Sequence, residues 1–399
     1  MQAVIFAAGK STRTYPLTLT KPKPLLEILG KSVLKHNLEQ LDGIVNEVII
    51  IVGYKKEQII EKFGNSFMSL KLRYIEQKEL NGTGGALICA KEFLKNKFIV
   101  MNGDDYFSKK DIERCFKHEF CVLGKKVNEL HRFGELVIKD NNIIEIKEKP
   151  QKKKGIANIG LYIFNDKIFE LHLKKSPRKE YEVTDYIKLL SNLGKKVNYE
   201  LVEDYWFPIT YPWNLLDANE FFINNLKSKN RGIIEKGATV KGNVIIGKNT
   251  IVKSGSYIEG PVVIGDNCKI GPNCYLRQNT SIGSNCNIGN AVEIKNSIIG
   301  NNTCIAHLSY VGDSIVGENV NFGAGTKIAN LRHDNLNVKS FVKGELVDTL
   351  RRKLGAILAD GVHTGINTSI NPGRKIWPNK TTLPGEVVNR DIQWFQITI

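Results

Sequence analysis

The 399-residue sequence lacks the marks of an exported or membrane-bound protein. Its first segment, MQAVIFAAGK, has no basic residue ahead of a short apolar stretch, whereas a secretory signal needs such a basic region. That stretch is also far shorter than the roughly 20 apolar residues that span a bilayer. We therefore expect a cytoplasmic protein that does not enter a membrane.

Negative charge is in short supply. The chain has 41 acidic against 57 lysine and arginine residues, a net charge of +16. This excess favours anionic ligands such as nucleotides, sugar phosphates and coenzyme A. It is equally typical of a lysine-rich solvated surface, as in KEKPQKKKG at residues 147–155. No recognised nucleic-acid module or basic stripe studded with aromatic residues is present, so we expect no nucleic-acid partner.

The second half of the chain has an aliphatic residue at every sixth position. This spacing fits neither a helix of 3.6 residues per turn nor an alternating strand. A smaller residue stands two positions before each one. The aliphatic series is Val240, Ile246, Val252, Ile258, Ile264, Ile270, Leu276, Ile282, Ile288 and Ile294, and the smaller series is Ala238, Val244, Thr250, Ser256, Val262, Cys268, Cys274, Thr280, Cys286 and Val292.

A period of six predicts short parallel strands stacked into a prism, with three strands per coil. Cys268, Cys274 and Cys286 take small inward positions, where a compact apolar side chain fits. The chain has seven cysteines and no C-x-x-C pair, which favours reduced structural thiols over metal ligands or disulfides. The repeat resembles the left-handed parallel β-helix of hexapeptide-repeat acyltransferases.

The ladder is interrupted in three places. The step from Ile294 to Ile299 is one residue short, and the step from Val311 to Val316 repeats this slip. Residues 331–354 then abandon the period and are predicted to leave the prism as an arm. Weaker coils resume near Ala356.

The first part of the chain alternates strands and helices instead. Predicted strands lie at residues 3–9, 47–53 and 97–104, and predicted helices at 32–41 and 84–94. This order implies a parallel sheet with ligands at the carboxyl ends of its strands. We expect an α/β Rossmann-like domain over residues 1–228 and the β-helix over residues 229–399.

Polar and glycine-rich motifs recur through this first domain. They are AAGKSTR from Ala7, TKPKP from Thr20, Glu76-Gln77, GTGG from Gly82, NGDD from Asn102, Glu148-Lys149-Pro150, Asn158-Ile159-Gly160 and EVTD from Glu182. In this order and at these spacings the set resembles sugar-1-phosphate nucleotidylyltransferases. Their reaction is in-line attack by a sugar phosphate on a nucleoside triphosphate, which needs positioning and charge neutralisation rather than a protein nucleophile.

The resemblance implies a role for each motif. The loop with Ala8, Gly9 and Arg13 would hold the triphosphate, and Lys23 would neutralise the phosphate under attack. The remaining implied positions are Gln77, Gly82 and Thr83 for the nucleotide, Asp104 for Mg²⁺, and Glu148 and Asn158 for the sugar phosphate.

One departure from this family concerns the metal. Its W-x-D-x-G motif reads WFPIT here, with Pro208 at the aspartate and Thr210 at the glycine. Asp105 and Asp204 are candidate replacements at a different spacing, and one carboxylate plus substrate phosphates can also hold Mg²⁺. Nucleotidylyl transfer and binding without turnover both stay open for this domain.

Distinctive residues gather around the two ladder slips. They lie in CYLR from Cys274, VEIK from Val292, AHLSYVGD from Ala306, NFGAGT from Asn321, and at Asn330. This set resembles the acetyltransferase half of bacterial bifunctional enzymes of UDP-N-acetylglucosamine synthesis, and still more their archaeal two-domain homologues.

In that family the histidine of H-L-S-Y, here His307, is the general base that accepts a proton from the attacking amine. The resemblance implies that Arg277 and Lys295 clamp the sugar phosphate. It further assigns Tyr310, Asn321 and Asn330 to the sugar, Glu293 to support of the sugar or base, and backbone N–H groups near Gly323 and Ala324 to the thioester oxygen.

These resemblances predict N-acetylation of glucosamine or galactosamine 1-phosphate by acetyl-CoA. Coupling of the product to UTP, with Mg²⁺, would then give a UDP-N-acetylhexosamine. The family's prisms form homotrimers, which we also expect here. The alternatives are an acetyltransferase without nucleotidylyl transfer, because of Pro208, and a non-catalytic regulatory or scaffolding subunit.

Overall fold

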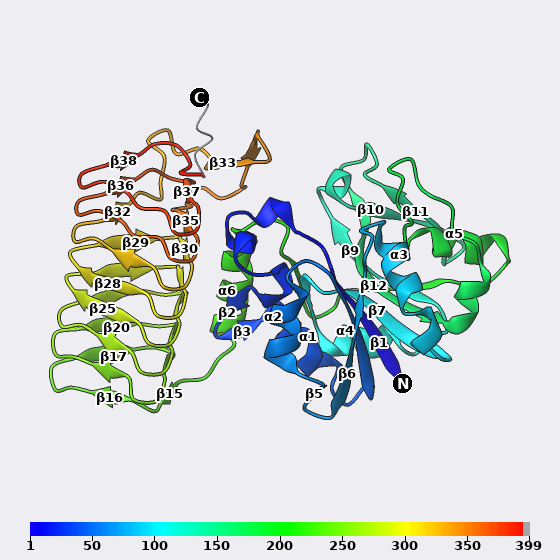
Figure 1. Cartoon of the computed structure of the whole chain (residues 1–399), viewed down its shortest axis with the longest axis horizontal. Helices are drawn as coiled ribbons and strands as arrows, with labels where there is room; N and C mark the ends of the chain where they lie inside the picture. The colour runs from blue at the N-terminus through cyan, green and yellow to red at the C-terminus, as the bar shows by residue number, and fades with distance from the viewer. Residues whose placement is uncertain (394–399) are drawn as a thin grey trace. The chain divides into compact units, whose positions relative to one another are not determined.

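A computed structural model describes residues 1–393 of the chain (Figure 1). By its contacts the chain divides into two compact units. The first comprises Met1–Lys10, Pro22–Leu25 and Ser32–Pro208, and the second Ser11–Lys21, Leu26–Lys31 and the chain from Ile209 onward. Among the described residues, no helix has the length and apolar character needed to cross a membrane.

The first unit is built on a ten-stranded sheet. Its main path runs β11-β10-β12-β7-β1-β4-β6-β5, and β9 and β13 join beside β12. The strands are β1 (Gln2–Ala7), β4 (Glu47–Val52), β5 (Ser66–Phe67), β6 (Leu70–Glu76), β7 (Lys97–Asn102), β9 (Cys121–Val127), β10 (Gly134–Lys139), β11 (Asn142–Glu148), β12 (Gly155–Asn165) and β13 (Asn198–Leu201). Two further strands, β8 (Asp105–Phe107) and β14 (Trp206–Pro208), pair with each other, as do β2 (Glu27–Ile28) and β3 (Lys31–Ser32).

The middle of this sheet is parallel, as the alternating sequence predicts. Strand β1 pairs in parallel with β4 and β7, and β4 with β6. The sheet as a whole is mixed, because β12 runs antiparallel to β7 and the β10–β11 hairpin is added at one edge. Successive residues of β1 alternate between two apolar clusters, Ala3 and Ile5 in one and Val4 in the other, which explains why the strand is apolar throughout.

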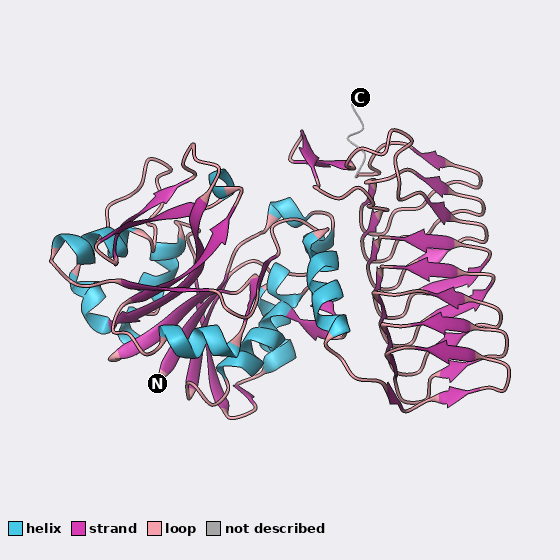
Figure 2. Ribbon diagram, turned by 180° about the vertical axis from the view of Figure 1, so that it is seen from behind, coloured by secondary structure: helices cyan, strands magenta, loops and turns pink. Residues whose placement is uncertain are grey.

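Helices cover this sheet (Figure 2). They are α1 (Val33–Leu41), α2 (Lys56–Phe63), α3 (Thr83–Cys89), α4 (Lys109–Cys115) and α5 (Asp185–Asn192), with α6 (Asn214–Asn224) following in the second unit. Helix α1 begins where the hydroxyl of Ser32 accepts the backbone N–H of Lys35 at 3.3 Å. Helix α4 begins in the same way, at Ser108.

The second unit contains a prism of three parallel sheets, the left-handed β-helix that the six-residue repeat predicts (Figure 1). The first sheet holds β15 (Lys229–Asn230), β18 (Val244–Ile246), β21 (Val262–Ile264), β24 (Thr280–Ile282), β27 (Ile298–Ile299), β30 (Ile315–Val316), β35 (Ile357–Leu358) and β37 (Lys375–Ile376). The second holds β16 (Ile233–Ile234), β19 (Ile251–Val252), β22 (Lys269–Ile270), β25 (Asn287–Asn290), β28 (Cys304–His307) and β31 (Asn321–Phe322). The third holds β17 (Thr239–Lys241), β20 (Tyr257–Glu259), β23 (Tyr275–Leu276), β26 (Glu293–Lys295), β29 (Tyr310–Gly312), β32 (Lys327–Ile328), β36 (Ser369–Ile370) and β38 (Val387–Val388).

The aliphatic ladder fills the inside of the prism. Ile270 stacks on Ile288, and Ile288 on Ile305, each fully buried. Cys268 and Cys286 lie between such residues and are also buried. All seven cysteines of the chain are free thiols, as the sequence predicts.

The two slips of the ladder are shortened coils. Ile264 pairs with Ile282, 18 residues further on, whereas Ile282 pairs with Ile299 after 17. The residue is lost at the corner between the third and first sheets, first between β26 and β27 and again between β29 and β30. Each tight corner has a residue in the left-handed conformation followed by a buried serine, Asn296 with Ser297 and Asp313 with Ser314.

Between β32 and β35 the chain leaves the coils. It forms an antiparallel hairpin of β33 (Lys339–Val342) and β34 (Glu345–Asp348). The isolated bridge from Leu331 to Lys353 closes this excursion at its base.

Corners of the prism depend on asparagine. At one corner Asn249, Asn267, Asn285 and Asn302 repeat a positive φ between 57° and 59°. Their amides stack, since Asn249 donates to Asn267 at 3.1 Å and Asn285 to Asn302 at 3.1 Å. Asparagine has two advantages at these corners. It tolerates the left-handed conformation better than most residues with a side chain, and its amide can also form a hydrogen bond with the asparagine of the next coil.

Replacement of Asn285 tests this dependence. We expect Asn285→Ala to lower the free energy of unfolding of the prism by about 1 kcal/mol, because alanine is strained at positive φ and cannot donate to Asn302. Asn285→Gly loses the same hydrogen bond without the strain, so its loss should be smaller. Denaturant titrations followed by circular dichroism measure both, and equal losses would contradict the backbone explanation.

Candidate active sites

The predicted phosphate loop of the first unit begins at the carboxyl end of β1. The carbonyl oxygen of Ala8 accepts the N–H of Tyr54 at 3.0 Å, and that of Phe6 accepts the N–H of Gly103 at 3.0 Å. A Cβ on Gly53 would lie 2.9 Å from the Ala8 oxygen, so glycine is needed for this close approach. The loops after β1, β4 and β7 are thereby packed at one edge of the sheet.

Two basic residues follow in this region of the sequence. Arg13 is exposed in the short 3₁₀ helix Thr12–Thr14, directly after Ser11, which has a φ of 51°. Lys23 is nearly buried, and its Nζ lies 2.6 Å from Oδ2 of Asp104. The structure therefore brings together the predicted phosphate-neutralising lysine and the predicted metal ligand.

The predicted nucleotide residues form a second cluster at the same edge. The amide of Gln77 is buried and donates to the carbonyl oxygen of Gly82 at 3.0 Å. The hydroxyl of Thr83 accepts the N–H of Val183 at 3.0 Å, so GTGG and EVTD are in contact. Gly82 has a φ of 100°, and a Cβ there would lie 2.3 Å from the carbonyl oxygen of Tyr181.

Glu148 and Asn158 meet around a glycine. A Cβ on Gly134 would lie 3.2 Å from Oε1 of Glu148 and 3.7 Å from Cβ of Asn158. Asn158 is oriented by the N–H of Gly160 at 3.2 Å and by the hydroxyl of Tyr162 at 2.7 Å. Burial of its carboxyl group raises the pKa of Glu148 above its usual value.

Pro208 lies beside the predicted metal ligand. Strand β14 pairs with β8 so that Pro208 is opposite Asp105, the residue after Asp104. The carboxylate of Asp105 is buried and accepts the indole N–H of Trp206 at 3.1 Å. Within residues 1–393, no group of three histidine, cysteine or carboxylate side chains could hold a metal ion. A Mg²⁺ ion at Asp104 would therefore have this one carboxylate as a ligand, with substrate phosphates supplying others.

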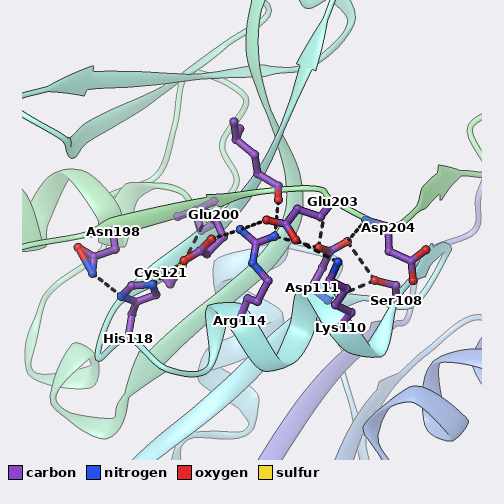
Figure 3. A network of polar contacts seen from close by, with 12 residues as sticks. Ser108, Lys110, Asp111, Arg114, His118, Cys121, Asn198, Glu200, Glu203 and Asp204 are labelled. Atoms are coloured by element: carbon purple, nitrogen blue, oxygen red, sulfur yellow. Dashed lines mark hydrogen bonds and ion pairs between the residues drawn. The ribbon is translucent and has the colours of Figure 1, made fainter.

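A network of charged side chains around the buried Asp111 holds the segment that leads into β14 (Figure 3). The carboxylate of Asp111 is fully buried and accepts the N–H groups of Glu203 at 3.0 Å and Asp204 at 3.2 Å. Arg114 bonds Glu200 and the carbonyl oxygen of Leu201, the latter at 3.0 Å. Sequence reasoning missed Asp111, although the spacing of Ser108 and Asp111 is that of a helix capping box.

The prism carries the second predicted site on its third sheet. Tyr275 is in register with Glu293, and Glu293 with Tyr310, so successive coils bring these positions into one column. Nη1 of Arg277 donates to Oε1 of Glu293 at 2.8 Å. Lys295 follows on the same strand as Glu293. The structure therefore gathers the predicted phosphate clamp and its neighbours on one face.

The shortened corner beside this column holds Asp313. Its Oδ2 accepts Nζ of Lys295 at 3.1 Å and Nδ2 of Asn330 at 2.5 Å. Nδ2 of Asn330 also donates to the hydroxyl of Tyr310 at 3.2 Å. Burial raises the pKa of Tyr310, with Asp313 acting in the same direction, so the phenol is protonated at neutral pH and can donate a hydrogen bond.

His307 stands at the end of β28, where the second sheet turns into the third. Its side chain is exposed, and its ring makes no hydrogen bond with the described residues. The carbonyl oxygen of His307 accepts the hydroxyl of Ser309 at 2.7 Å, and the intervening Leu308 has a φ of 50°. This tight corner holds the backbone while leaving the ring accessible to a ligand.

The other predicted residues of this site lie one coil further on. Asn321 is exposed on β31, in register with Cys304, and bridges to His363. The N–H of Gly323 already donates to the carbonyl oxygen of Thr364 at 3.0 Å. The N–H of Ala324 has no acceptor among residues 1–393, which makes it the available donor of this turn.

Comparison with known proteins agrees with both halves. Residues 2–225 match the Nucleotidyl transferase family, and residues 258–390 match the GMPPB C-terminal domain. A crystal structure from Bacillus anthracis, named as that of a glucose-1-phosphate thymidylyltransferase, is also similar. Its TM-score is 0.52 at 26% identity, and the match covers 58% of this chain and 98% of that one.

Three archaeal relatives are similar along nearly the whole chain. "Bifunctional protein GlmU" of Methanocaldococcus jannaschii is 42% identical over 397 residues, and that of Methanococcus maripaludis strain C7 is 45% identical over 399, each covering 98% of this chain and 96% of the relative. "Bifunctional sugar-1-phosphate nucleotidylyltransferase/acetyltransferase" of Sulfurisphaera tokodaii is 40% identical over 405 residues, covering 98% of both. The chain therefore belongs to the GlmU-type family of bifunctional nucleotidyltransferase/acetyltransferases.

Proposed function

We propose that this protein is a cytoplasmic enzyme that transfers the acetyl group of acetyl-CoA to the 2-amino group of glucosamine 1-phosphate or its galacto epimer. The first unit then couples the product to UTP, which gives a UDP-N-acetylhexosamine and pyrophosphate. The observation that carries this proposal is that neighbouring coils of the third sheet gather Arg277, Glu293, Lys295 and Tyr310, while the exposed His307 stands at the turn that leads into the strand of Tyr310.

His307 acts as the general base of acetyl transfer. An ammonium ion is not a nucleophile, so the attacking amine must lose a proton, and a neutral imidazole accepts it. The exposed ring of His307 suits this role because the described residues leave both of its nitrogens free for substrate. Attack forms the new carbon–nitrogen bond, and the thiolate of coenzyme A leaves with the carbon–sulfur bond pair.

The sugar phosphate is held by the cations of the column. Arg277 offers a planar pair of donors suited to a phosphate, and Glu293 fixes its orientation by the 2.8 Å bond. Lys295 adds a second charge from the next coil. Tyr310, Asn321 and Asn330 contact the sugar hydroxyl groups. The N–H of Ala324 stabilises the charge that develops on the thioester oxygen, with Gly323 fixing the turn.

The first unit performs nucleotidylyl transfer by positioning. In this unit Ala8 and Gly9 bind the triphosphate, Gln77, Gly82 and Thr83 bind the nucleoside, and Glu148 and Asn158 bind the sugar phosphate. Arg13, which the motif also assigns to the triphosphate, belongs by its contacts to the second unit. Lys23 lies against Asp104, and its charge neutralises the α-phosphate as the sugar phosphate oxygen attacks. Mg²⁺ bound at Asp104 supplies further charge neutralisation when it is present.

A second candidate function is acetyl transfer alone. It is favoured by Pro208, which stands opposite Asp105 where the family has a metal-binding carboxylate. In this case the first unit binds nucleotide or sugar phosphate without turnover and regulates the prism. Pyrophosphate release from UTP distinguishes the two.

We further propose a homotrimer formed through the β-helix. Its support is the family, together with exposed apolar side chains on the prism such as Leu308, Ile366 and Leu383. Sedimentation equilibrium should give three times the 44.8 kDa mass of one chain, and a mass of one chain would overturn the proposal.

Replacement of the proposed base tests acetyl transfer. We expect His307→Ala to lower kcat for thiol release from acetyl-CoA and glucosamine 1-phosphate by about 10² to 10⁴-fold, because general-base catalysis contributes that much. His333→Ala is the matched control, since His333 is exposed on the excursion between β32 and β35. Unchanged turnover in His307→Ala would remove the base assignment.

Restoring a carboxylate tests nucleotidylyl transfer. Pro208→Asp adds a carboxylate opposite Asp105, the residue that follows Asp104 in the sequence. We expect it to lower the Mg²⁺ concentration for half-maximal pyrophosphate release by about tenfold, because an added ligand charge strengthens cation binding. Pro208→Ala, which removes the ring without adding charge, is the control. Absence of pyrophosphate release in both the parent and Pro208→Asp would leave acetyl transfer as the enzyme's activity.

A further inference from the structure

Asp313 is a buried carboxylate beneath the sugar-phosphate column. Its side chain is 4% exposed, in the second of the two shortened corners of the prism. It receives three donors from the two neighbouring coils: Lys295 at 3.1 Å and Asn296 at 2.6 Å from the coil before, and Asn330 at 2.5 Å from the coil after. Neither the six-residue repeat nor the sequence motif that contains His307 explains why this position is an aspartate.

The backbone of the corner does not require a negative charge there. The preceding shortened corner has Asn296 in the same left-handed conformation, with φ 45° against 50° for Asp313. Each is followed by a serine that bonds back two residues, Ser297 to Lys295 at 2.7 Å and Ser314 to Gly312 at 2.8 Å. Because a neutral amide satisfies one corner, the carboxylate in the other needs a different explanation.

Two of its three partners, Lys295 and Asn330, are side chains proposed above to bind the sugar phosphate. Lys295 is 22% exposed at the side chain, so its ammonium has one donor on Asp313 and others directed to solvent. Asn330 is held between Asp313 and the hydroxyl of Tyr310. A Cβ on Gly312 would lie 2.5 Å from that hydroxyl and 2.7 Å from Nδ2 of Asn330, so glycine keeps the space open for this contact.

We propose that Asp313 is a positioning residue that orients Lys295 and Asn330 toward the sugar phosphate. This inference rests on the proposed acetyl transfer and deepens it. A flexible lysine loses side-chain entropy when it binds a phosphate, which weakens binding. An ion pair with Asp313 already restricts the Lys295 side chain before the substrate binds, so less entropy is lost on binding. Asp313 also fixes the amide orientation of Asn330, because its carboxylate accepts only from the NH₂ group. The side-chain oxygen Oδ1 of Asn330 is then left to accept from a sugar hydroxyl.

Asp313→Asn tests this role with little change in shape. We expect the KM for glucosamine 1-phosphate to rise about tenfold or more, the loss typical of a hydrogen bond to a charged group, while kcat falls less than about threefold. The KM for acetyl-CoA should stay within about twofold of the parent, because Asp313 contacts no residue of the turn at Ala324. The assay is steady-state thiol release by the full-length protein.

Asp266→Asn is the matched control. Asp266 also occupies a corner of the prism, where it accepts the backbone N–H of Lys248 at 2.7 Å, but its side chain is 41% exposed and its ion-pair partner is Arg231. The same chemical change there should leave both KM values unaltered. Thermal unfolding of the two variants shows whether either loses the fold.

A second background separates positioning from general support of the fold. In Lys295→Ala the amine is gone, so Asp313→Asn should raise the KM for the sugar phosphate by clearly less than it does in the parent. A full tenfold rise in that background, or an unchanged KM in the single variant, would overturn the inference. Parent protein that does not acetylate the aminosugar phosphate at all would instead overturn the proposed function, and the two failures are thus distinguishable.

Discussion

The stacking of successive coils, with residues in the left-handed conformation at many of its corners, is the constraint on which the second unit depends. Parallel strands lie about 4.8 Å apart, so residues one coil apart become direct neighbours. Arg277 and Glu293, or Glu293 and Tyr310, are distant in sequence and adjacent in space for this reason alone. Loss of one residue at a corner shifts all later positions. The first such loss brings Gly312 into register with Lys295, so that the next residue, Asp313, reaches its ammonium group.

The candidate site of the first unit also gathers polar side chains that are distant in sequence, but it does not use stacked coils. Its candidate site is built from loops at the ends of strands, and close backbone approach sets its shape. Glycines at positions 53, 82 and 134 each allow a neighbour to come nearer than a Cβ would permit. At position 208 a proline stands where the family has a metal-binding aspartate. Strand β14 still pairs with β8 there, although the carboxylate is absent. Chemistry in this unit can therefore change without disturbing the sheet.

Much of the fold was predictable from the sequence, because burial imposes a period on it. The ladder of aliphatic residues gave the prism and its shortened coils, and the apolar runs gave β1, β4 and β7. The sheet was harder, since nothing local in β12 shows that it runs antiparallel to β7. In the candidate sites, motifs predict roles for His307, Lys23 and Asp104, and the structure places Lys23 against Asp104. The motifs did not point to Asp111, and AHLSYVGD contains Asp313 without indicating its role. The partners of both residues come together only once the register between coils, or between helix and strand, is formed.

The structure also indicates which basic residues account for the net charge of +16. Three of the cations proposed to contact phosphate are paired with carboxylates: Lys23 with Asp104, Arg277 with Glu293, and Lys295 with Asp313. The sites are thus locally close to neutral, and the surplus charge lies in the solvated lysines elsewhere on the chain. Such a surplus draws anions over long distances, in a manner that salt screens. The paired carboxylates act at short range instead, because they fix where each cation points, and that determines which phosphate it can hold.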